Sequence, residues 1–283
     1  MINKPVLLAV LAHPDDESFG MGGTLALYAS RGVDVHLVCA TRGEVGEVDD
    51  LKGFASIAEL REAELRCAAV HLGLKGIHFL DYRDSGMDGS PDNQHPNALA
   101  AQPLDEVAAK VVHYIRELHP QVVLTFDPIG GYRHPDHIAI HKATVRAFEQ
   151  AANTGFAPDV KPPFQPQRLY FHTIPHGFLK TVVRLLRLFG KDAHKWGKNG
   201  DIDLAAIAEV DFPTNARIDV RSVLEKKEKA GACHASQGGG RMGGNLAGSI
   251  LRLFSGQENF MRAYPPVEPG EKVERDLFAS VIE

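Results

Sequence analysis

Short apolar runs alternate with amphipathic segments through the first 150 residues, and this alternation limits the possible fold more than any other feature. The apolar runs have the length and the β-branched content of buried strands, whereas the segments between them repeat apolar residues at helical spacing. Such alternation is typical of crossover units on a parallel sheet. We therefore predict an α/β fold with a Rossmann-like, mainly parallel sheet flanked by helices. The predicted strands are residues 5–11, 34–41, 76–80, 121–126 and 168–172, and the predicted helices are residues 24–29, 57–72, 104–118 and 138–151.

The second half of the chain is less regular. A Pro-rich stretch at 157–166 predicts a surface loop, and we expect a strand at 217–220 followed by a charged helix at 222–232. Residues 178–189 predict a basic amphipathic helix, which we expect to pack on the core or cover a pocket rather than contact a membrane. The Gly-rich residues 238–244 predict a loop, because they lack the Lys-Ser/Thr pair of a phosphate-binding loop.

We expect one domain over residues 1–283. Within it, residues 1–155 form the α/β core that carries the candidate site, and residues 156–283 form a C-terminal elaboration that shapes the pocket.

Polar loops follow four of the predicted strands. These loops contain His13, Glu44, Asp84 and His134, in chain order. Right-handed crossovers place the loops after parallel strands on one rim of the sheet, and ligands of open α/β sheets bind at that rim. We therefore expect the four loops to converge on a single site.

The first of these loops, Ala12-His13-Pro14-Asp15-Asp16-Glu17, packs an imidazole and three carboxylates into five residues. Carboxylates this close repel one another and resist removal from water unless a cation or hydrogen bonds neutralise them. A divalent metal ion is the simplest such cation.

Three residues of these loops suit a catalytic zinc ion. His13 and Asp16 are separated by two residues, and a later strand end brings His137 to the same rim. Two histidines, one carboxylate and an open position are typical of catalytic zinc. The open position would hold water, whose pKa zinc can lower to roughly 7. Asp15 and Glu17 are left as candidates to take the proton of that water, and we favour Asp15 as the general base.

Each part of this pattern also has a simpler explanation. A single loop histidine is more often hydrogen-bonded than a metal ligand, and acidic residues before a helix often cap it. Arg61 and Glu64, three residues apart on one helix face, could form only a surface ion pair. Residues 20–23 resemble a dinucleotide-binding loop, but they do not fit G-x-G-x-x-G. The presence of two His-Pro-Asp loops, each after a strand, favours the metal site.

Composition sets broad limits on function. The chain has 283 residues, of which 44% are hydrophobic and 24% charged, as in an ordinary globular protein. Its formal net charge of −5 implies no general affinity for nucleic acid. Cys39, Cys67 and Cys233 are widely spaced, so the sequence predicts neither a disulfide framework nor a cysteine metal site. We see no signal peptide and no run of about 20 apolar residues, and we expect a cytoplasmic enzyme without a membrane span.

The loop motifs resemble those of one known family. They are Ala12 to Glu17, Thr41-Arg42-Gly43-Glu44-Val45-Gly46, Arg61 with Glu64, and Gly131-Tyr132-Arg133-His134-Pro135-Asp136-His137. With them the chain is similar to the LmbE-like (PIG-L) zinc de-N-acetylases, from residue 5 to about 150 and again at 229–237 and 276–278. Residues 82–87 and 130–132 most resemble the mycothiol branch, which acts on N-acetylglucosaminyl-inositol or on mycothiol conjugates, whereas residues 18–23 resemble the generic form of the family.

The resemblance implies a role for each residue of the site. The carboxylate matching Asp15 acts as the base, the histidine matching His134 stabilises the oxyanion, and the tyrosine matching Tyr132 assists catalysis. The metal ligands are the positions matching His13, Asp16 and His137. In the mycothiol branch the positions matching Arg61 and Asp84 contact the sugar, and we add Glu44 as a further sugar-binding candidate. A supporting ion-pair network is an equal alternative for these three.

In the implied mechanism Asp15 deprotonates the attacking water, while zinc and His134 meet the charge that develops on the amide oxygen. We expect Asp136 to orient His134 and raise its pKa, to cap the next helix, or both. Either Asp15 or His134 could return a proton to the leaving amine. His234-Ala235-Ser236-Gln237 also matches a family motif, without an assigned role.

We therefore predict a zinc-dependent hydrolase that removes the N-acetyl group from a small molecule containing N-acetylglucosamine. One alternative is a zinc amidase for a larger amide, such as a thiol S-conjugate, and another is a non-catalytic sugar-binding member of the family. The sequence leaves open which amide is cut, whether the metal is zinc or iron, and whether the chain forms a homo-oligomer.

Overall fold

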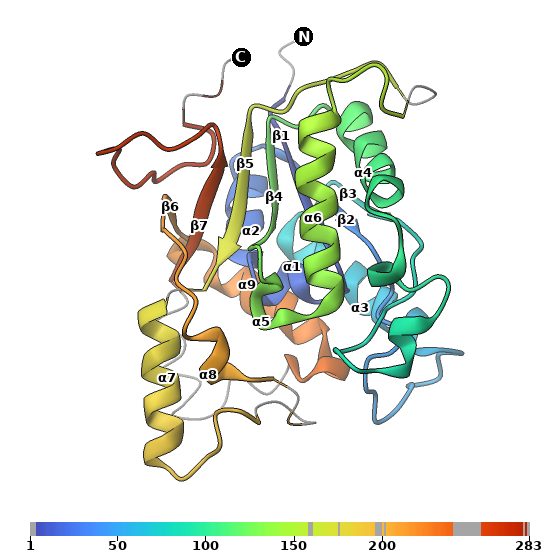
Figure 1. The fold of residues 1–283 in the computed structure, drawn as a ribbon, viewed down its shortest axis with the longest axis vertical. Helices are drawn as coiled ribbons and strands as arrows, with labels where there is room; N and C mark the ends of the chain where they lie inside the picture. The colour runs from blue at the N-terminus through green and yellow to red at the C-terminus, as the bar shows by residue number, and fades with distance from the viewer. Residues whose placement is uncertain are drawn as a thin grey trace.

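A single sheet runs through the part of the chain that the computed structural model describes, namely residues 4–157, 161–174, 176–195, 200, 202–239, 256–279 and 281. The sheet has seven strands in the order β3-β2-β1-β4-β5-β7-β6 (Figure 1). The strands are β1 (Val6–Leu11), β2 (Asp34–Cys39), β3 (Gly76–Phe79), β4 (Val122–Phe126), β5 (Arg168–Thr173), β6 (Ala216–Asp219) and β7 (Gln257–Tyr264).

β1 lies inside the sheet because its side chains are apolar on both faces. Residues Leu7 to Leu11 are fully buried, as expected for a parallel strand covered by helices on both sides. β1 pairs in parallel with β2, where Leu7 is opposite Val35, and with β4, where Leu8 is opposite Val123. The predicted α/β fold with a mainly parallel sheet is confirmed.

The sheet reverses its winding between β1 and β4. The chain leaving β1 returns to the sheet at β2 on one side, whereas the chain leaving β4 returns at β5 on the other. Two loops that diverge in this way leave a crevice at the carboxyl ends of the adjacent strands, which is where open α/β sheets bind their ligands.

Helices cover both faces of the sheet. α4 and α6 pack together on the face in front in Figure 1, and α2, α3 and α9 pack against one another on the opposite face. The helices are α1 (Asp16–Phe19), α2 (Gly22–Ser30), α3 (Ile57–Leu72), α4 (Leu104–Leu118), α5 (Gly130–Arg133), α6 (Pro135–Gln150), α7 (His176–Leu188), α8 (Leu204–Ile207) and α9 (Leu224–Cys233). Short 3-10 turns lie at Pro91–Gln94, Leu99–Ala101, Arg221–Val223 and Ala235–Gln237.

α3 and α4 have the predicted bounds, but α6 begins three residues before the predicted start at Ile138. The reason is the residue before it: the side chain of His134 caps the helix by accepting the N–H of Asp136, and Pro135 occupies the first helical position. Proline is favoured there, because its missing N–H would have no partner inside the helix.

β7 was not predicted, and it makes the edge of the sheet antiparallel. Its polar residues break the apolar alternation that marks a strand, yet Glu258 is buried. The carboxylate of Glu258 accepts the N–H groups of Gly23 and Thr24 at the start of α2, at 2.9 and 2.7 Å. It also contacts Lys227 Nζ at 2.6 Å. A buried acid therefore ties β7 to a helix N-terminus, which explains its polar sequence.

A disulfide between Cys67 and Cys233 joins α3 to the end of α9. The sequence predicted no disulfide framework, and a separation of 166 residues gives no spacing from which the pair could have been deduced. Of the predicted loop at 238–244, residues 240–244 lie outside the described residues. Among the helices that the structure describes, none has both the length and the apolar character needed to cross a membrane.

Candidate active site

The four polar loops converge at the carboxyl ends of the strands, as predicted. His13 Nε2 lies 3.5 Å from an oxygen of Asp84, and the N–H of Asp84 donates to Glu44 at 3.0 Å. The rings of His13 and His134 lie 4.6 Å apart, centre to centre. Residues from the loops after β1, β2, β3 and β4 therefore form one cluster.

The turn after β1 holds Asp15 in an unusual backbone conformation. Its φ angle is 119°, which non-glycine residues adopt rarely and only when their surroundings hold them there. The N–H of Asp15 donates to Glu17 at 3.0 Å. The other carboxylate oxygen of Glu17 lies 2.8 Å from Nε2 of His234, and both side chains are fully buried. The buried Glu17–His234 pair thus helps to hold the backbone of Asp15 in this conformation.

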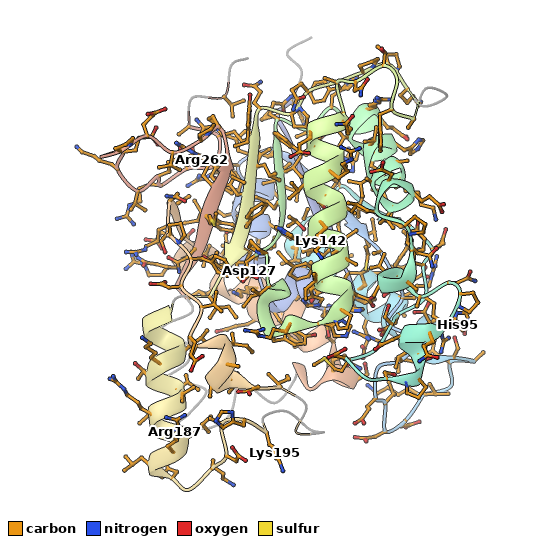
Figure 2. The ribbon with its side chains drawn as sticks, viewed as in Figure 1. His95, Asp127, Lys142, Arg187, Lys195 and Arg262 are labelled. Carbon is orange, nitrogen blue, oxygen red and sulfur yellow. A yellow bond between two sulfur atoms is a disulfide. The ribbon has the colours of Figure 1, made fainter. Side chains whose placement is uncertain are left out.

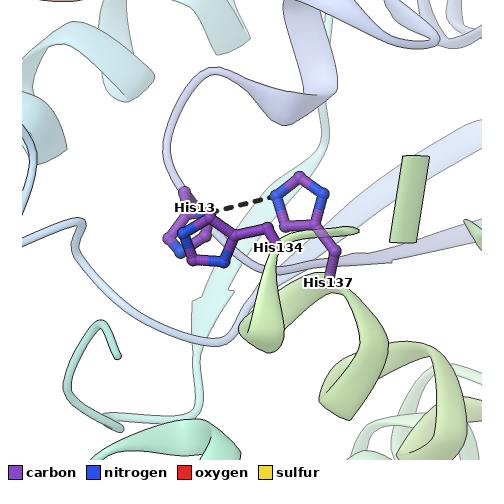
Figure 3. Close-up of side chains that lie close together, drawn as sticks. All are labelled: His13, His134 and His137. Atoms are coloured by element: carbon purple, nitrogen blue, oxygen red, sulfur yellow. Dashed lines mark hydrogen bonds between the residues drawn. The ribbon is translucent and has the colours of Figure 1, made fainter. Parts of the chain in front are cut away.

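Three donor groups meet around one point beside Asp15. His13 Nδ1 lies 3.2 Å from His137 Nε2 (Figure 3). The two carboxylate oxygens of Asp16 lie 3.6 Å from His13 Nδ1 and 3.3 Å from His137 Nε2. Ligands about 2.0–2.1 Å from a tetrahedral metal ion are about 3.3 Å apart. The separations in the structure, which use a different Asp16 oxygen for each ring, are close to that value, so these residues are placed to hold a metal ion.

The far edge of the His13 ring is held by a carboxylate. His13 Nε2 lies 3.1 Å from Asp136, whose two oxygens also accept the N–H and the hydroxyl of Ser85. Metal-binding histidines commonly donate their second ring N–H to a carboxylate in this way. The expectation that Asp136 orients His134 is wrong, because its carboxylate is already bound to His13 and Ser85. Asp136 does not cap α6 either, since its N–H is capped by His134.

Within this cluster, donor atoms of two further sets of described residues are close enough to hold an ion: His13 with His134 and His137, and His13 with Asp84 and Asp136. The second grouping lies at the Nε2 edge of His13, where Asp136 is bonded to Ser85 and Asp84 accepts the N–H of Gly86. Asp16 also accepts one N–H, that of His13 at 2.7 Å, but its other oxygen faces His137 Nε2 at 3.3 Å. The site can therefore hold a metal ion, and the Nδ1 edge of His13 suits it best.

The cluster favours positive charge. Burial opposes a charge on the His13 ring, but the charge of Asp84 and the hydrogen bonds of Asp136 and Asp16 raise the pKa of His13 well above its ordinary value. The same carboxylates would stabilise a divalent cation in place of that proton.

His134 is held as a neutral imidazole. Its Nδ1 accepts the N–H of Asp136 at 3.2 Å, so the ring proton is carried by Nε2. Burial, and then the neighbouring His13 and His137, lower the pKa of His134 to about 2. The expectation that His134 stays protonated is therefore wrong. It can still donate a hydrogen bond through Nε2–H.

Asp15 has the opposite shift. Burial raises the pKa of its carboxyl group to about 6, with a further rise from Asp16 and an opposing effect of the Arg61 guanidinium. Arg61 Nη2 lies 3.2 Å from the Asp15 carboxylate. A carboxylate with a pKa near neutrality is suited to take and return a proton at physiological pH.

Arg61 is buried, and its guanidinium hydrogen-bonds mainly to backbone carbonyl oxygens. Beside Asp15, its guanidinium donates to the carbonyl oxygens of Pro14 at 2.7 Å and Gly43 at 3.0 Å. A Cβ atom at Gly43, where φ is 68°, would lie only 2.0 Å from Arg61 Nη1. Glycine is therefore required there, and Arg61 links the first two loops. It is not the surface partner of Glu64, which instead accepts the N–H of Ser236 at 2.9 Å.

The other two sugar-binding candidates, Asp84 and Glu44, hold one loop against another. The buried carboxyl of Asp84 faces His13 and accepts the N–H of Gly86 at 2.8 Å, while Glu44 accepts the N–H of Asp84. Burial opposes ionisation of Asp84, but the charge of His13 and these hydrogen bonds lower its pKa. The contacts of Asp84 and Glu44 are those of a supporting network.

Tyr132 lies beside the two histidines that follow β4. Its ring centre is 4.8 Å from that of His137 and 5.8 Å from that of His134. Asp127, labelled in Figure 2, lies just after β4 and shapes this loop by accepting the N–H groups of Ile129 and Gly131 at 3.1 and 2.9 Å. A Cβ atom at Gly130 would lie 2.8 Å from His137 Cβ, so the loop can approach the ring only with glycine there.

Sequence reasoning missed three supporting residues: Glu17 as the acceptor for Asp15, Ser85 as the partner of Asp136, and His234 as the partner of Glu17. Glu17 and His234 are 217 residues apart, so no local pattern connects them. The signal for His234 was its place in the His234-Ala235-Ser236-Gln237 motif, and the structure now gives that motif two contacts with the site scaffold, at Glu17 and Glu64.

Comparisons with known proteins place this chain in a family. The sequence pattern of the family described as "PIG-L: GlcNAc-PI de-N-acetylase" matches residues 8–148. A relative from Acidothermus cellulolyticus, named 1D-myo-inositol 2-acetamido-2-deoxy-alpha-D-glucopyranoside deacetylase, is 38% identical over 293 aligned positions, which cover 97% of this chain and 94% of the relative. The chain belongs to the PIG-L family. Its resemblance to these enzymes, inferred from the loop motifs, is confirmed.

Further relatives agree with this membership. A protein of the same name from Thermobifida fusca is 36% identical, over 98% of this chain and 100% of the relative. Among solved structures, N,N'-diacetylchitobiose deacetylase from Pyrococcus horikoshii superposes with a TM-score of 0.61 at 21% identity, over 95% of this chain and 88% of that one. The latter likeness concerns the fold. As a PIG-L member with deacetylases as its relatives, this chain is an N-deacetylase, a hydrolase of an amide C–N bond.

Proposed function

We propose that this PIG-L member is a zinc-dependent enzyme that removes the acetyl group from the nitrogen of an N-acetylglucosamine-containing small molecule, with N-acetylglucosaminyl-inositol as the substrate. The observation that carries the proposal is the triangle of His13 Nδ1, His137 Nε2 and the Asp16 carboxylate, with separations of 3.2 to 3.6 Å, beside Asp15. The names of the relatives supply the substrate class.

His13, Asp16 and His137 would hold the ion. Two imidazoles and a carboxylate suit zinc and also iron(II), and we propose zinc because amide hydrolysis needs no redox change. A zinc ion held there would supply a Lewis acid that polarises the amide carbonyl and makes water more acidic. Asp136, through its contact with Nε2, fixes the orientation of the His13 ring and leaves Nδ1 as the ligand atom.

Asp15 takes the proton of the attacking water. Its side chain lies next to the ligand Asp16 and is partly accessible, with an exposed fraction of 17%. Burial raises its pKa to about 6, so it is ionised at neutral pH and still basic enough to accept a proton. Arg61 and the Glu17 contact to its N–H fix its orientation.

His134 stabilises the oxyanion as a neutral donor. Because Nδ1 accepts the N–H of Asp136, Nε2 carries the ring hydrogen, which we assign to the oxygen of the reacting carbonyl. Removing one donor of this kind typically raises the barrier by about 3 kcal/mol. A pKa of about 2 makes His134 a poor carrier of a second proton. We therefore assign the return of the proton to the leaving amine to Asp15.

The remaining residues shape the pocket. Tyr132, beside His134 and His137, is placed to assist at the reacting carbonyl. We propose that residues 156–283 elaborate the core domain at this rim, because Tyr132 and Ile129 pack against a small apolar cluster formed by α7, α8 and the residues between them. In this scheme the main role of Arg61, Asp84 and Glu44 is to position the loops. They contact the sugar only through their solvent-accessible atoms. A cytoplasmic location and a homo-oligomeric state stay predictions.

Amine release tests the proposal. The zinc-loaded chain is assayed with N-acetylglucosaminyl-inositol, N-acetylglucosamine, diacetylchitobiose and a mycothiol conjugate. The Asp15→Asn variant is the negative control, or blank. We expect release from N-acetylglucosaminyl-inositol that is absent from the blank. Release from the bulky conjugate alone would make the enzyme an amidase for larger substrates, and no release from any of the four would overturn the proposed substrate class.

A further inference from the structure

A second group of metal-binding side chains lies outside the four loops, where α3 packs against α9. Cys67 and His71 are four residues apart on α3 and therefore share a face of the helix, and Cys233 is the last residue of α9. The two sulfur atoms and one ring nitrogen of His71 all lie within 4.8 Å of one another. This group is built from two elements, and its residues take no part in the mechanism above.

The group is open to solvent. Cys67 is exposed, and His71 and Cys233 are partly exposed, so an ion can reach all three without unfolding of the chain. Cys39 is different, because it is buried and bonded to neither of them. Within the described residues, the side chain of His71 makes no hydrogen bond or ion pair, so its ring is available as a ligand.

In the structure the two sulfur atoms form a disulfide. A disulfide alone gives no reason for an imidazole beside it, whereas two thiolates with an imidazole are a typical zinc ligand set that leaves one position for water. Two thiolates on tetrahedral zinc lie about 3.8 Å apart, given Zn–S bonds of about 2.3 Å. The Cα atoms of Cys67 and Cys233 are 5.8 Å apart, so rotation of the side chains suffices to open the sulfurs to that separation.

We propose that Cys67, His71 and Cys233 form a second metal site, which binds zinc or another thiophilic divalent ion when the cysteines are reduced and is closed by the disulfide when they are oxidised. A dithiol supplies the two electrons and the two hydrogens that convert the disulfide into two thiols, and is itself oxidised to a disulfide. The metal then displaces one proton from each thiol as the two sulfur–metal bonds form.

Both forms join α3 to α9 at the same place. That junction also carries the contact of Ser236 with Glu64, and Cys233 directly precedes His234, the buried partner of Glu17. A metal ion that replaces the disulfide would therefore keep these contacts in place after reduction. When the cysteines are reduced and no metal is bound, neither the disulfide nor the ion joins α9 to α3. In that form α9 is attached to α3 least firmly.

Cobalt tests this site separately from the catalytic one, because only thiolate ligands give a sulfur-to-cobalt charge-transfer band. The full chain is reduced with a phosphine, which is oxidised to the phosphine oxide with the oxygen of water, and is then titrated with Co²⁺ and, separately, with Zn²⁺. We expect the thiolate band in the reduced chain and its absence from the oxidised chain. The reduced chain should also bind about one more zinc ion per chain than a Cys67→Ser/Cys233→Ser double variant.

The matched control is Cys39→Ser, which should keep both the band and the additional zinc. His71→Ala should weaken binding of the additional ion without preventing disulfide formation, and excess Mg²⁺ should not displace it. Equal zinc content in the reduced chain and the double variant, or no thiolate band with Co²⁺, would overturn the site. Loss of the band in Cys39→Ser would assign the thiolate to a different residue. These readouts do not depend on deacetylase activity, so failure of the proposed substrate would leave them unchanged.

Discussion

Glu17 and His234 lie 2.8 Å apart with no exposed surface on either side chain, and the second oxygen of Glu17 accepts the N–H of Asp15 at 3.0 Å. The C-terminal end of α9 is thus connected through one buried carboxylate to the backbone of the proposed base. The contact explains why a motif more than 200 residues from the first loop belongs to the same site.

Replacing His234 with alanine should destabilise the fold. The change leaves the Glu17 carboxylate buried without its main partner, and breaking a buried pair in this way costs about 3 kcal/mol or more. Denaturant unfolding monitored by circular dichroism measures the loss. Lys229→Ala, which removes an exposed ion pair with Glu225 on the same helix, is the matched control and should change little. Equal stabilities of the two variants would mean that the buried pair contributes nothing.

Asp15→Asn should abolish most of the activity while the metal stays bound. Asparagine cannot accept the proton of the attacking water, and loss of a general base typically slows a reaction by about 10²–10⁴-fold. His137→Ala should instead lose the metal, because it removes one corner of the triangle of ligands. Metal content by elemental analysis, measured with kcat for both variants, separates the two effects. A near wild-type rate in Asp15→Asn would refute its role as base.

The pH dependence of kcat/KM should carry the signature of Asp15. The base works only when ionised, so activity falls as the pH drops through its pKa, which burial raises to about 6 before the effect of any bound cation, which would lower it. Arg61 opposes that rise from 3.2 Å. Arg61→Gln should therefore move the acidic limb of the profile to higher pH than Arg61→Lys, which keeps the charge. Limbs at the same pH in both variants would show that Arg61 does not tune Asp15.

Asp136→Asn should weaken metal binding rather than remove it. The variant loses the charged acceptor for His13 Nε2 at 3.1 Å, and changes of this kind usually lower metal affinity by about 10–100-fold. Competition with a chromophoric chelator gives the affinity. Asp92→Asn, on a carboxylate that contacts Arg83 and Ser90 away from the cluster, serves as the comparison and should bind as tightly as the wild type. Unchanged affinity in Asp136→Asn would place the metal away from His13.

The first half of the fold and the convergence of its loops could be predicted because both follow from local patterns. Each parallel strand is a nearly continuous apolar run, and the crossover rule fixes where the loops after such strands meet. The antiparallel edge could not be predicted, because β7 buries Glu258, Asn259 and Arg262 and therefore lacks an apolar alternation. The burial of Glu258 is explained only by the N-terminus of α2, which lies beside it in the structure.

Within the site, too, contacts between residues close in sequence could be predicted, whereas contacts between distant residues could not. His13, Asp15 and Asp16 are adjacent in the chain, so their proximity was visible in the sequence. The partner of Asp136 was not, because His134, two residues away, is closer in sequence than His13, which lies 123 residues away and makes the contact in the structure. The protonation state of His134 could not be predicted from the sequence either, because its pKa depends on burial and on two other histidines.

Titration of the metal-free chain with zinc, with the Cys67–Cys233 disulfide intact, shows whether deacetylation depends on an ion held by His13, Asp16 and His137. Amine release from N-acetylglucosaminyl-inositol is followed as zinc is added to the wild type and to His137→Ala. We expect activity to rise with zinc and to saturate near one ion per chain in the wild type, and we expect the variant to stay inactive at the same concentrations. Full activity in the metal-free wild type, or equal activation of His137→Ala, would contradict this expectation.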